Sequence, residues 1–296
     1  MNTRLAIVGF EHVHASHYLS CLQSMPDLSV VAIVEADARK VAEYSEQIGL
    51  VPCMADYREL IRSSSVDGVI LCSANSRHKQ MVIDIARAGI PILCEKPLAT
   101  KMVDAREMLA IVEAHGANLG ICFPCRFSES LQQAKHWIEN GVLGEIIAVN
   151  ATNHGTMPGG WFTDPALSGG GAIMDHTVHV VDALRWLFDR EFVRVYAQAS
   201  TRLRSLSVED VAVLSLEMSN GLFVTLDSSW SRPSLSFPIW GDVKLAVVGT
   251  SGILHLVLFQ WTLRPYLALA AKHVAVSLDG ALIPRLVASF VHSIPS

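Results

Sequence analysis

The amino-acid sequence predicts an α/β fold in two parts: a doubly wound parallel sheet, then an α+β domain with a large, open-faced, mostly antiparallel sheet. In residues 1–122, apolar runs of strand length alternate with helical patterns, which is typical of parallel βαβ units. After residue 123, strand-like runs follow one another, and Asn220-Gly221 and Ser251-Gly252 separate pairs of them as hairpin turns do. We therefore predict two domains, 1–122 and 123–296, the first of the nucleotide-binding type.

The first domain is expected to alternate strands and helices along its length. Right-handed crossovers would place its apolar strands parallel to one another in one sheet. The predicted strands cover residues 4–10, 28–34, 53–54, 66–72, 90–94 and 118–123, and the predicted helices cover 14–25, 38–49, 57–62, 79–88 and 99–115.

The second domain is expected to pair two helices, over 128–140 and 173–188, with a large sheet. A loop rich in Gly and Pro spans 155–170. The predicted strands cover 146–153, 193–200, 211–218, 222–229, 243–248 and 253–258. Because a large sheet with one uncovered apolar face needs a partner, we expect a homodimer or homotetramer formed through that face.

Composition excludes several classes of protein. Of the 296 residues, 51% are hydrophobic and 17% are charged, which excludes a disordered chain. No apolar run approaches the roughly 18 residues of a membrane span. The net charge of −5 comes with no basic stripe, so we expect neither a membrane nor a nucleic acid as partner. A strand near the first residue and six cysteines, mostly in apolar runs, indicate a cytoplasmic protein with reduced thiols and no signal peptide.

The turn after the first strand is a weak match to a dinucleotide-binding turn. Such turns place glycine where the backbone bends, where it approaches the pyrophosphate and where helix meets strand. Here these positions are Gly9, Glu11 and His14, so only the first is glycine, and Glu11 would repel a pyrophosphate unless it points away. Glu35, at the end of the second strand, is better placed. An acid there accepts from both ribose hydroxyls and repels a 2′-phosphate, which favours NAD over NADP.

Two polar segments, residues 73–78 and Glu95-Lys96-Pro97, each follow a predicted parallel strand. The carboxyl ends of such strands are where open α/β sheets bind ligands. Pro97 biases Lys96 to an extended conformation at the edge of the crevice, where a desolvated lysine can exchange protons near neutral pH. A surface ion pair between Glu95 and Lys96 is the alternative interpretation.

Gly169-Gly170-Gly171 leads directly into a helical pattern that carries Asp175 and His179. Because these two residues are four apart, on a helix they lie one turn from each other on the same face. A carboxylate beside an imidazole orients the ring and favours its protonated form, so the pair is a candidate acid/base device. An ordinary surface pair is the alternative.

Together these motifs resemble one family, the Gfo/Idh/MocA oxidoreductases, named for glucose-fructose oxidoreductase and inositol dehydrogenase. The resemblance runs from about residue 4 to about residue 258. Its most specific marks are the segment 95–99 and the three glycines followed by Asp175 and His179. The supporting marks are Asn75, His78, the turn at 141–145, Trp161-Phe162 and the segment 247–252.

The resemblance implies an N-terminal Rossmann domain that binds NAD(P) and a sheet domain that completes the substrate site. It implies that Lys96 contacts the reacting hydroxyl or carbonyl, that Asp175 binds substrate and orients the histidine, and that His179 accepts or donates the proton. Arg126 and His154 are further candidates for substrate contacts. The expected cofactor contacts are Gly9, Phe10, His12, Val13, Glu35, Ser73, Asn75, His78, Glu95 and Lys96.

The sequence also departs from the family pattern. Ala74 stands where the family usually has proline, and Thr177 stands where glycine often occurs. The usual C-terminal helix, loop and helix would be cut short at Ser296, which indicates a shortened or incomplete C-terminus.

The expected reaction is hydride transfer between a nicotinamide cofactor and a secondary alcohol or carbonyl of a sugar, polyol or related cyclic compound. One alternative uses NAD transiently for elimination or glycoside cleavage, so that NADH does not accumulate. Another is a non-enzymatic sensor of a dinucleotide or sugar, which the altered glycine turn favours.

Two clusters contain residue types that bind metals: His12, His14 and His17, and Asp175, His176 and His179. The first lies where the cofactor is expected, and the second matches a family motif that binds no metal. We therefore expect no metal site.

Overall fold

The computed structural model describes residues 2–63, 66–237, 241–260, 262–267, 276–277 and 281–295. The chain divides into two compact units, each with its own sheet and core. The first unit comprises Met1–Cys122, Ala166–Gly169 and Ile283–Ser296, and the second comprises Phe123–Pro165 and Gly170–Leu282. The main division follows residue 122, where the sequence analysis places it. Residues 166–169 and 283–296 group with the first unit, although the sequence analysis assigns them to the second domain.

The first unit contains a parallel sheet of six strands among the described residues, in the order β3-β2-β1-β4-β5-β6. The strand order reverses between β1 and β4, which is the kind of switch point where open α/β sheets bind ligands. The strands are β1 (Thr3–Val8), β2 (Leu28–Val34), β3 (Cys53–Met54), β4 (Gly68–Leu71), β5 (Ile92–Cys94) and β6 (Leu119–Ile121).

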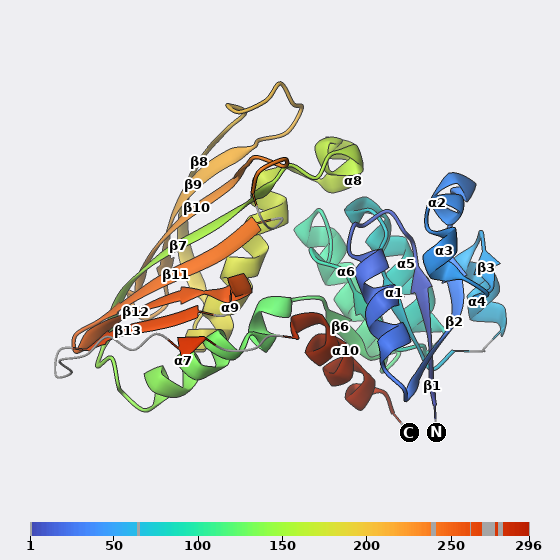
Figure 1. Cartoon of the computed structure of the whole chain (residues 1–296), viewed down its shortest axis with the longest axis horizontal. Helices are drawn as coiled ribbons and strands as arrows, with labels where there is room; N and C mark the ends of the chain where they lie inside the picture. The colour runs from blue at the N-terminus through green and yellow to red at the C-terminus, as the bar shows by residue number, and fades with distance from the viewer. Residues whose placement is uncertain are drawn as a thin grey trace. The chain divides into compact units, whose positions relative to one another are not determined.

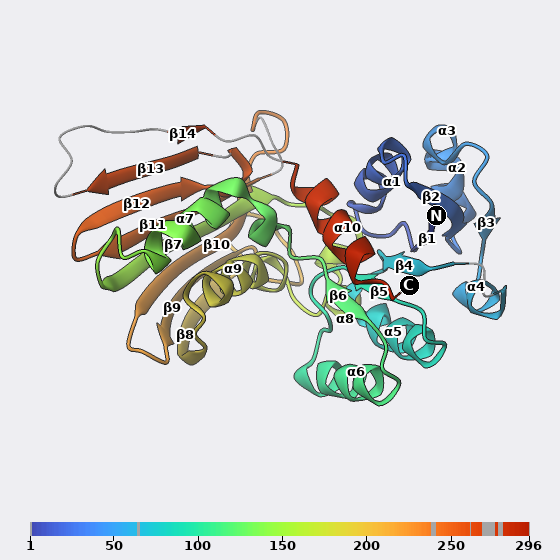
Figure 2. The ribbon, with the colours of Figure 1, turned by 90° about the horizontal axis from the view of Figure 1, so that it is seen from below.

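Helices cover both faces of this sheet. Figure 2 shows α5 and α6 on one side of the sheet and α1 and α10 on the other. The helices are α1 (Ala15–Ser24), α2 (Ala38–Glu43), α3 (Ser45–Ile48), α4 (Tyr57–Ser63), η1 (Asn75–Arg77), α5 (His78–Arg87), α6 (Met102–Ala114), α8 (Pro165–Ser168) and α10 (Leu282–Ser293). On the first side, buried residues of α5 and α6 such as Val82 and Met108 pack against Val69 and Ile92 of the sheet.

The helix α10 is absent from the sequence prediction. Its buried residues Leu286, Val287 and Phe290 form one apolar face. A Cβ placed on Gly68 of β4 would lie 3.2 Å from the Phe290 ring, so the helix packs directly on the sheet. The structure therefore adds a helix to a stretch for which the sequence analysis predicts no element.

The second unit is built on a sheet of eight strands in its described part, in the order β14-β13-β12-β11-β7-β10-β9-β8 (Figure 1 and Figure 2). Neighbouring strands are antiparallel, except that β10 runs parallel to β7. The strands are β7 (Ile146–Thr156), β8 (Phe192–Ser200), β9 (Val211–Met218), β10 (Phe223–Arg232), β11 (Gly241–Gly249), β12 (Gly252–Val257), β13 (Thr262–Leu267) and β14 (Val276–Ser277). The two sheets confirm the predicted fold class, and both predicted hairpins form, β9–β10 and β11–β12.

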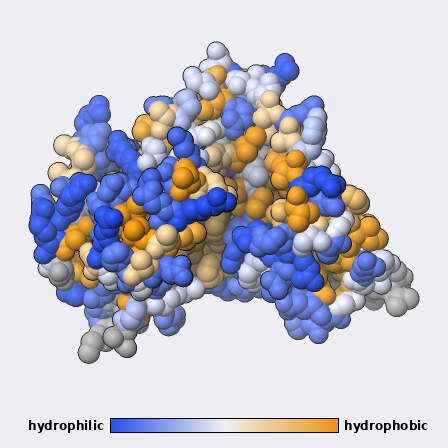
Figure 3. All heavy atoms as spheres, turned by 180° about the vertical axis from the view of Figure 1, so that it is seen from behind, coloured by the Kyte–Doolittle hydropathy of each residue, from blue (hydrophilic) through white to orange (hydrophobic). Residues whose placement is uncertain are grey.

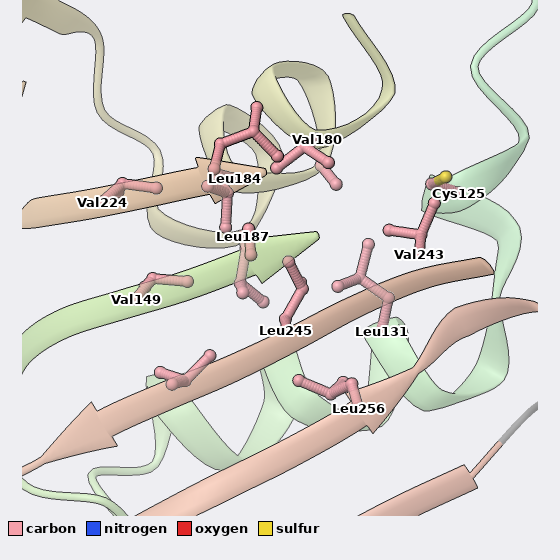
Figure 4. Packing of buried hydrophobic residues seen from close by; sticks show 14 of the residues in the cluster. Cys125, Leu131, Val149, Val180, Leu184, Leu187, Val224, Val243, Leu245 and Leu256 are labelled. Atoms are coloured by element: carbon pink, nitrogen blue, oxygen red, sulfur yellow. The ribbon is translucent and has the colours of Figure 1, made fainter. Parts of the chain in front are cut away.

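Two helices cover one face of the second sheet, and the core lies between (Figure 4). Val180, Leu184 and Leu187 of α9 are at most 2% exposed, and they pack with sheet residues such as Val149 and Leu245. The helices of this unit are η2 (Pro124–Phe127), α7 (Glu129–Glu139), η3 (Gly160–Thr163), η4 (Ile173–Thr177), α9 (Val178–Phe188) and η5 (Leu258–Gln260). The segment 155–170, expected to be a loop, thus contains the last residues of β7 and two short helices.

We predict that Phe290→Ala destabilises the protein by about 3–5 kcal/mol, the usual cost of removing a buried aromatic ring. The ring is 4% exposed and packs over Gly68. Urea unfolding followed by circular dichroism measures the effect, and His292→Ala, an exposed substitution in the same helix, is the control. A wild-type midpoint for Phe290→Ala would show that α10 does not stabilise the sheet.

Candidate active site

The turn after β1 approaches the end of β4 so closely that only glycine fits at its first position. Gly9 has φ +87°, and a Cβ there would lie 3.0 Å from the backbone of Ser73. The next residue, Phe10, donates its amide N–H to Oε2 of Glu35 at 2.6 Å. Oε1 of Glu35 accepts the amide N–H of Asp37 at 2.8 Å. The structure thus brings together four predicted cofactor residues, Gly9, Phe10, Glu35 and Ser73.

Glu11 does not present an unpaired charge to this region. Its Oε2 accepts the amide N–H of Ala74 at 2.9 Å, and its Oε1 pairs with the Arg77 guanidinium at 2.9 Å. Both partners lie just after β4 in the chain. The loop after β4 therefore holds Glu11, which stands where a dinucleotide-binding turn usually has glycine. The sequence analysis missed Arg77, because nothing in the spacing of Glu11 and Arg77 indicates that the two meet.

A small cavity of about 50 Å³ marks the same place, lined by Gly9, Glu11, Glu35, Ser73 and Arg77 among others. The backbone cradle at Gly9 and the acid at the end of β2 fit the adenosine side of a dinucleotide. The positive charge of Arg77 offsets the negative charge of Glu11. The residues present are therefore compatible with NAD.

Asn75 and His78 hold the loop after β4. Asn75 is 5% exposed and donates its side-chain N–H to the carbonyl of Ser168 at 2.9 Å. His78 is fully buried between two carbonyls, with Nδ1 2.9 Å from Pro97 O and Nε2 3.1 Å from Ser73 O. Burial lowers the pKa of His78. His78 therefore links the loop after β4 to the loop after β5, which carries Lys96.

The loop after β5 is built on a buried carboxylate. Glu95 is fully buried; its Oε1 accepts the Tyr18 hydroxyl at 3.0 Å and lies 2.9 Å from His14 Nδ1. Its Oε2 accepts the amide N–H of Lys96 at 3.0 Å. Burial by itself would raise the pKa of Glu95, but His12, His14 and Lys96 hold that pKa below its ordinary range. Lys96 is only 3% exposed, so it does not form the surface ion pair considered as an alternative.

The two remaining turn residues differ in exposure. His12 is 2% exposed, donates its amide N–H to Cys72 O and places Nε2 3.8 Å from Glu95 Oε2. The side chain of Val13 is half exposed.

In the second unit, Asp175 lies in the π-helical turn η4 directly before α9. Such turns are frequent at functional sites. Trp230, fully buried on β10, donates its indole N–H to Asp175 Oδ2 at 3.0 Å. His176 Nε2 lies 3.2 Å from the same oxygen, and its Nδ1 lies 3.2 Å from Asn153 O. Trp230, which the sequence analysis does not name, and His176, which it names only among metal-binding residue types, therefore fix the Asp175 carboxylate.

His179 follows on the first turn of α9 and is 2% exposed.

Glycine is required at position 171, before η4, for a steric reason. A Cβ on Gly171 would lie 1.9 Å from the carbonyl oxygen of Glu209, and the Gly171 amide donates to Glu209 Oε1 at 2.9 Å. The close approach of this backbone to Glu209 positions the segment that carries Asp175 and His179.

The structure pairs Arg126 and His154 away from Asp175. Arg126 Nε donates to Asp182 Oδ2 at 2.8 Å. His154 lies on β7, whose preceding residue, Asn153, donates its side-chain N–H to His176 O at 2.9 Å. Because neighbouring residues of a strand point to opposite faces, His154 lies on the other face of the sheet, where its Nε2 is 3.1 Å from Asp227 Oδ2. We therefore do not place His154 in the candidate site.

Comparison with known proteins identifies the family. Residues 3–123 match the model of an oxidoreductase family with an NAD-binding Rossmann fold, and residues 131–255 match the model of the GFO/IDH/MocA C-terminal domain. The chain belongs to the GFO/IDH/MocA oxidoreductases. Its first unit is thus the NAD-binding Rossmann domain of this family, as the resemblance predicted.

Several members are similar over most of the chain. D-glucoside 3-dehydrogenase of Escherichia coli is 30% identical over 77% of this chain and 70% of its own length. Myo-inositol 2-dehydrogenase of Thermotoga maritima is 26% identical over 84% of this chain and 73% of its own. Among solved structures, levoglucosan dehydrogenase in complex with NADH and L-sorbose has a TM-score of 0.86 at 21% identity, covering 98% of this chain and 88% of that one. At this identity the structural likeness concerns the fold.

Among the described residues, no helix has the length and apolar character needed to cross a membrane.

We predict that Arg126→Ala destabilises the protein by about 1–3 kcal/mol at neutral pH, because a carboxylate that is 5% exposed loses its ionic partner. Burial raises the pKa of Asp182 above 3.8, and Arg126 opposes this. The protonated carboxyl therefore favours folding at acid pH, whereas the ionised form opposes folding above its folded pKa. The loss should shrink as the pH falls toward 3.8.

Urea unfolding at neutral pH and near pH 4 tests this prediction. Arg194→Ala, which breaks an exposed pair with Glu217, is the control and should change stability by less than about 0.5 kcal/mol. Equal losses for Arg126→Ala at both pH values would contradict the proposed role of the Asp182 charge.

Proposed function

We propose that this oxidoreductase transfers a hydride between NAD and a secondary alcohol or carbonyl of a sugar, polyol or related cyclic compound. One observation carries the proposal: Lys96, of a residue type that is rarely buried, is 3% exposed and follows β5 in the NAD-binding unit. Relatives named D-glucoside 3-dehydrogenase and myo-inositol 2-dehydrogenase support the substrate class.

The proposed roles follow from the chemistry of alcohol oxidation. The hydroxyl proton must leave as the hydride departs, and bound NAD supplies the hydride acceptor. His179 is proposed to take this proton. Lys96 is proposed to stabilise the negative charge that develops on the substrate oxygen, and Asp175 to bind a substrate hydroxyl. The contacts of Trp230 and His176 with Oδ2 support the last role, because they hold the Asp175 carboxylate in one orientation.

NAD is preferred over NADP in this proposal because of Glu35. Its carboxylate follows β2 directly and is held by the amides of Phe10 and Asp37. An ionised acid fixed there accepts from ribose hydroxyls and repels a 2′-phosphate. The proposed cofactor contacts remain Gly9, Glu35, Ser73 and Asn75, together with the other residues named from the sequence.

We predict that NADH binds more tightly than NADPH and that Glu35→Gln reduces this preference by about tenfold, because the charged hydrogen bonds to the ribose are lost. Energy transfer from tryptophan to nicotinamide in a titration measures both dissociation constants. Glu43→Gln, which removes an exposed carboxylate from the next helix, is the control for net charge. If neither dinucleotide binds the wild-type protein, the enzyme proposal fails and a non-enzymatic sugar sensor replaces it.

We predict that Lys96→Ala and His179→Ala each lower turnover by about 10²–10⁴-fold while NADH binding is largely kept. The assay follows NADH absorbance with polyols and sugars, including myo-inositol and a D-glucoside, as substrates. Lys101→Ala and His136→Ala, both exposed, are matched controls. A near-wild-type rate in either test variant would remove that residue from the mechanism. Substrate conversion without net NADH would indicate the transient use of NAD.

The uncovered face of the second sheet supports a further part of the proposal, a homodimer or homotetramer. Large apolar side chains that are at least half exposed lie on its strands, among them Ile147, Tyr196, Val213 and Phe223. A second copy of the chain would remove these side chains from water. On the face of the molecule that Figure 3 shows, apolar side chains also gather in patches between polar ones.

A further inference from the structure

Three side chains that can bind a metal lie together at the turn after β1, within the first unit. One ligand atom from each of His12, His14 and Glu95 lies within 4.8 Å of the other two. His14 Nδ1 is 2.9 Å from Glu95 Oε1, and His12 Nε2 is 3.8 Å from Glu95 Oε2. The sequence analysis considered His17 as the third member, but the structure brings Glu95 into the cluster from the end of β5.

The spacing of these atoms suits a small divalent cation. Zinc bonds of about 2.0–2.2 Å to nitrogen and oxygen place neighbouring ligand atoms of a tetrahedron about 3.3–3.6 Å apart. His14 approaches Oε1 of Glu95 and His12 approaches Oε2, so rotations of these side chains would bring both imidazoles and a carboxylate oxygen to one cation. His12 and Glu95 are buried, whereas the His14 side chain is 21% exposed and leaves the cluster accessible from solvent.

Two neighbouring hydrogen-bond donors fix the orientation of the Glu95 carboxylate. The Tyr18 hydroxyl and the Lys96 amide donate to its two oxygens, each at 3.0 Å, as groups around a metal site orient its ligands. Binding through Nε2 would move the His12 ring proton to Nδ1, which now accepts the His14 amide at 3.2 Å. That long neutral hydrogen bond is weak compared with a metal–imidazole bond.

We propose that His12, His14 and Glu95 bind one divalent transition-metal cation at the turn after β1. Two imidazoles and one carboxylate are a ligand set that Zn²⁺ and Fe²⁺ accept, and three protein ligands leave a coordination position for water or a ligand oxygen. The inference goes beyond the proposed function, and it gives a metal-binding role to His12 and Glu95, which are also among the proposed NAD contacts.

Metal titration of the tag-free, EDTA-treated full-length protein tests the inference. Calorimetry with Zn²⁺ should give one equivalent bound with a micromolar or lower dissociation constant, and Co²⁺ should develop visible absorbance at the same stoichiometry. His14→Ala, the accessible member, should weaken binding at least tenfold. His17→Ala is the matched control, since its exposed ring lies 6.2 Å from that of His14 and outside the ligand set; its affinity should stay within twofold of wild type.

Two results would overturn the inference: no saturable Zn²⁺ binding by the wild-type protein, or equal binding by wild type and His14→Ala. Circular dichroism of His14→Ala establishes that a loss of binding is not a loss of fold. NADH titration of the metal-free protein tests the proposed function separately. Zinc binding without NADH binding would uphold the metal site and reject the enzyme, and NADH binding without zinc binding would do the opposite.

Discussion

Glu95 places a negative charge in the interior of the first unit, where an unpaired carboxylate would be strongly destabilising. Its partners come from three parts of the chain: His14 in the first turn, Tyr18 on α1 and the backbone of Lys96. The need to satisfy this one group therefore ties the turn after β1 to the loop after β5. Since the same loop is also held by His78 through Pro97, Lys96 starts from a fixed backbone position.

In the second unit, the carboxylate of Asp175 is likewise held by partners from the surrounding structure. A π-helical turn widens the helix at Ile173–Thr177, and the carboxylate meets an indole N–H from β10 and an imidazole from its own turn. The backbone before it passes so close to Glu209 that a side chain at Gly171 would collide with a carbonyl. Gly171 thus belongs to the positioning of Asp175 as much as to the turn itself.

Local sequence patterns predict the bounds of a strand where a short apolar run lies between turn-forming residues. Residues 28–34 and 211–218 form strands with the predicted bounds, and the Asn220-Gly221 hairpin forms as its turn residues require. Partners distant in sequence were not predictable. No local signal joins Glu11 to Arg77 or Asp175 to Trp230, because these contacts depend on how the strands are ordered in each sheet.

The predicted end of the strand near His154 differs from the structure for another reason. The sequence analysis ends this strand at residue 153, whereas β7 continues to Thr156, and its alternation directs the His154 side chain to the face opposite that of Asn153. The sequence analysis predicts no element at α10, which lies beyond the segment that resembles the family. The apolar spacing of Leu286, Val287 and Phe290 was a readable helical signal.

Because α10 belongs to the first unit, the order of synthesis and the order of folding differ in this protein. The strands of the NAD-binding sheet leave the ribosome first, but the helix that covers Gly68 and contacts Asn118 through Ser293 is made more than 170 residues later. Until then, one face of the sheet lacks part of its cover while the whole second unit is being made. Contacts of such long sequence separation slow folding and lengthen the exposure of apolar surface. A chaperone that binds exposed apolar strands would therefore have its longest opportunity at the N-terminal unit.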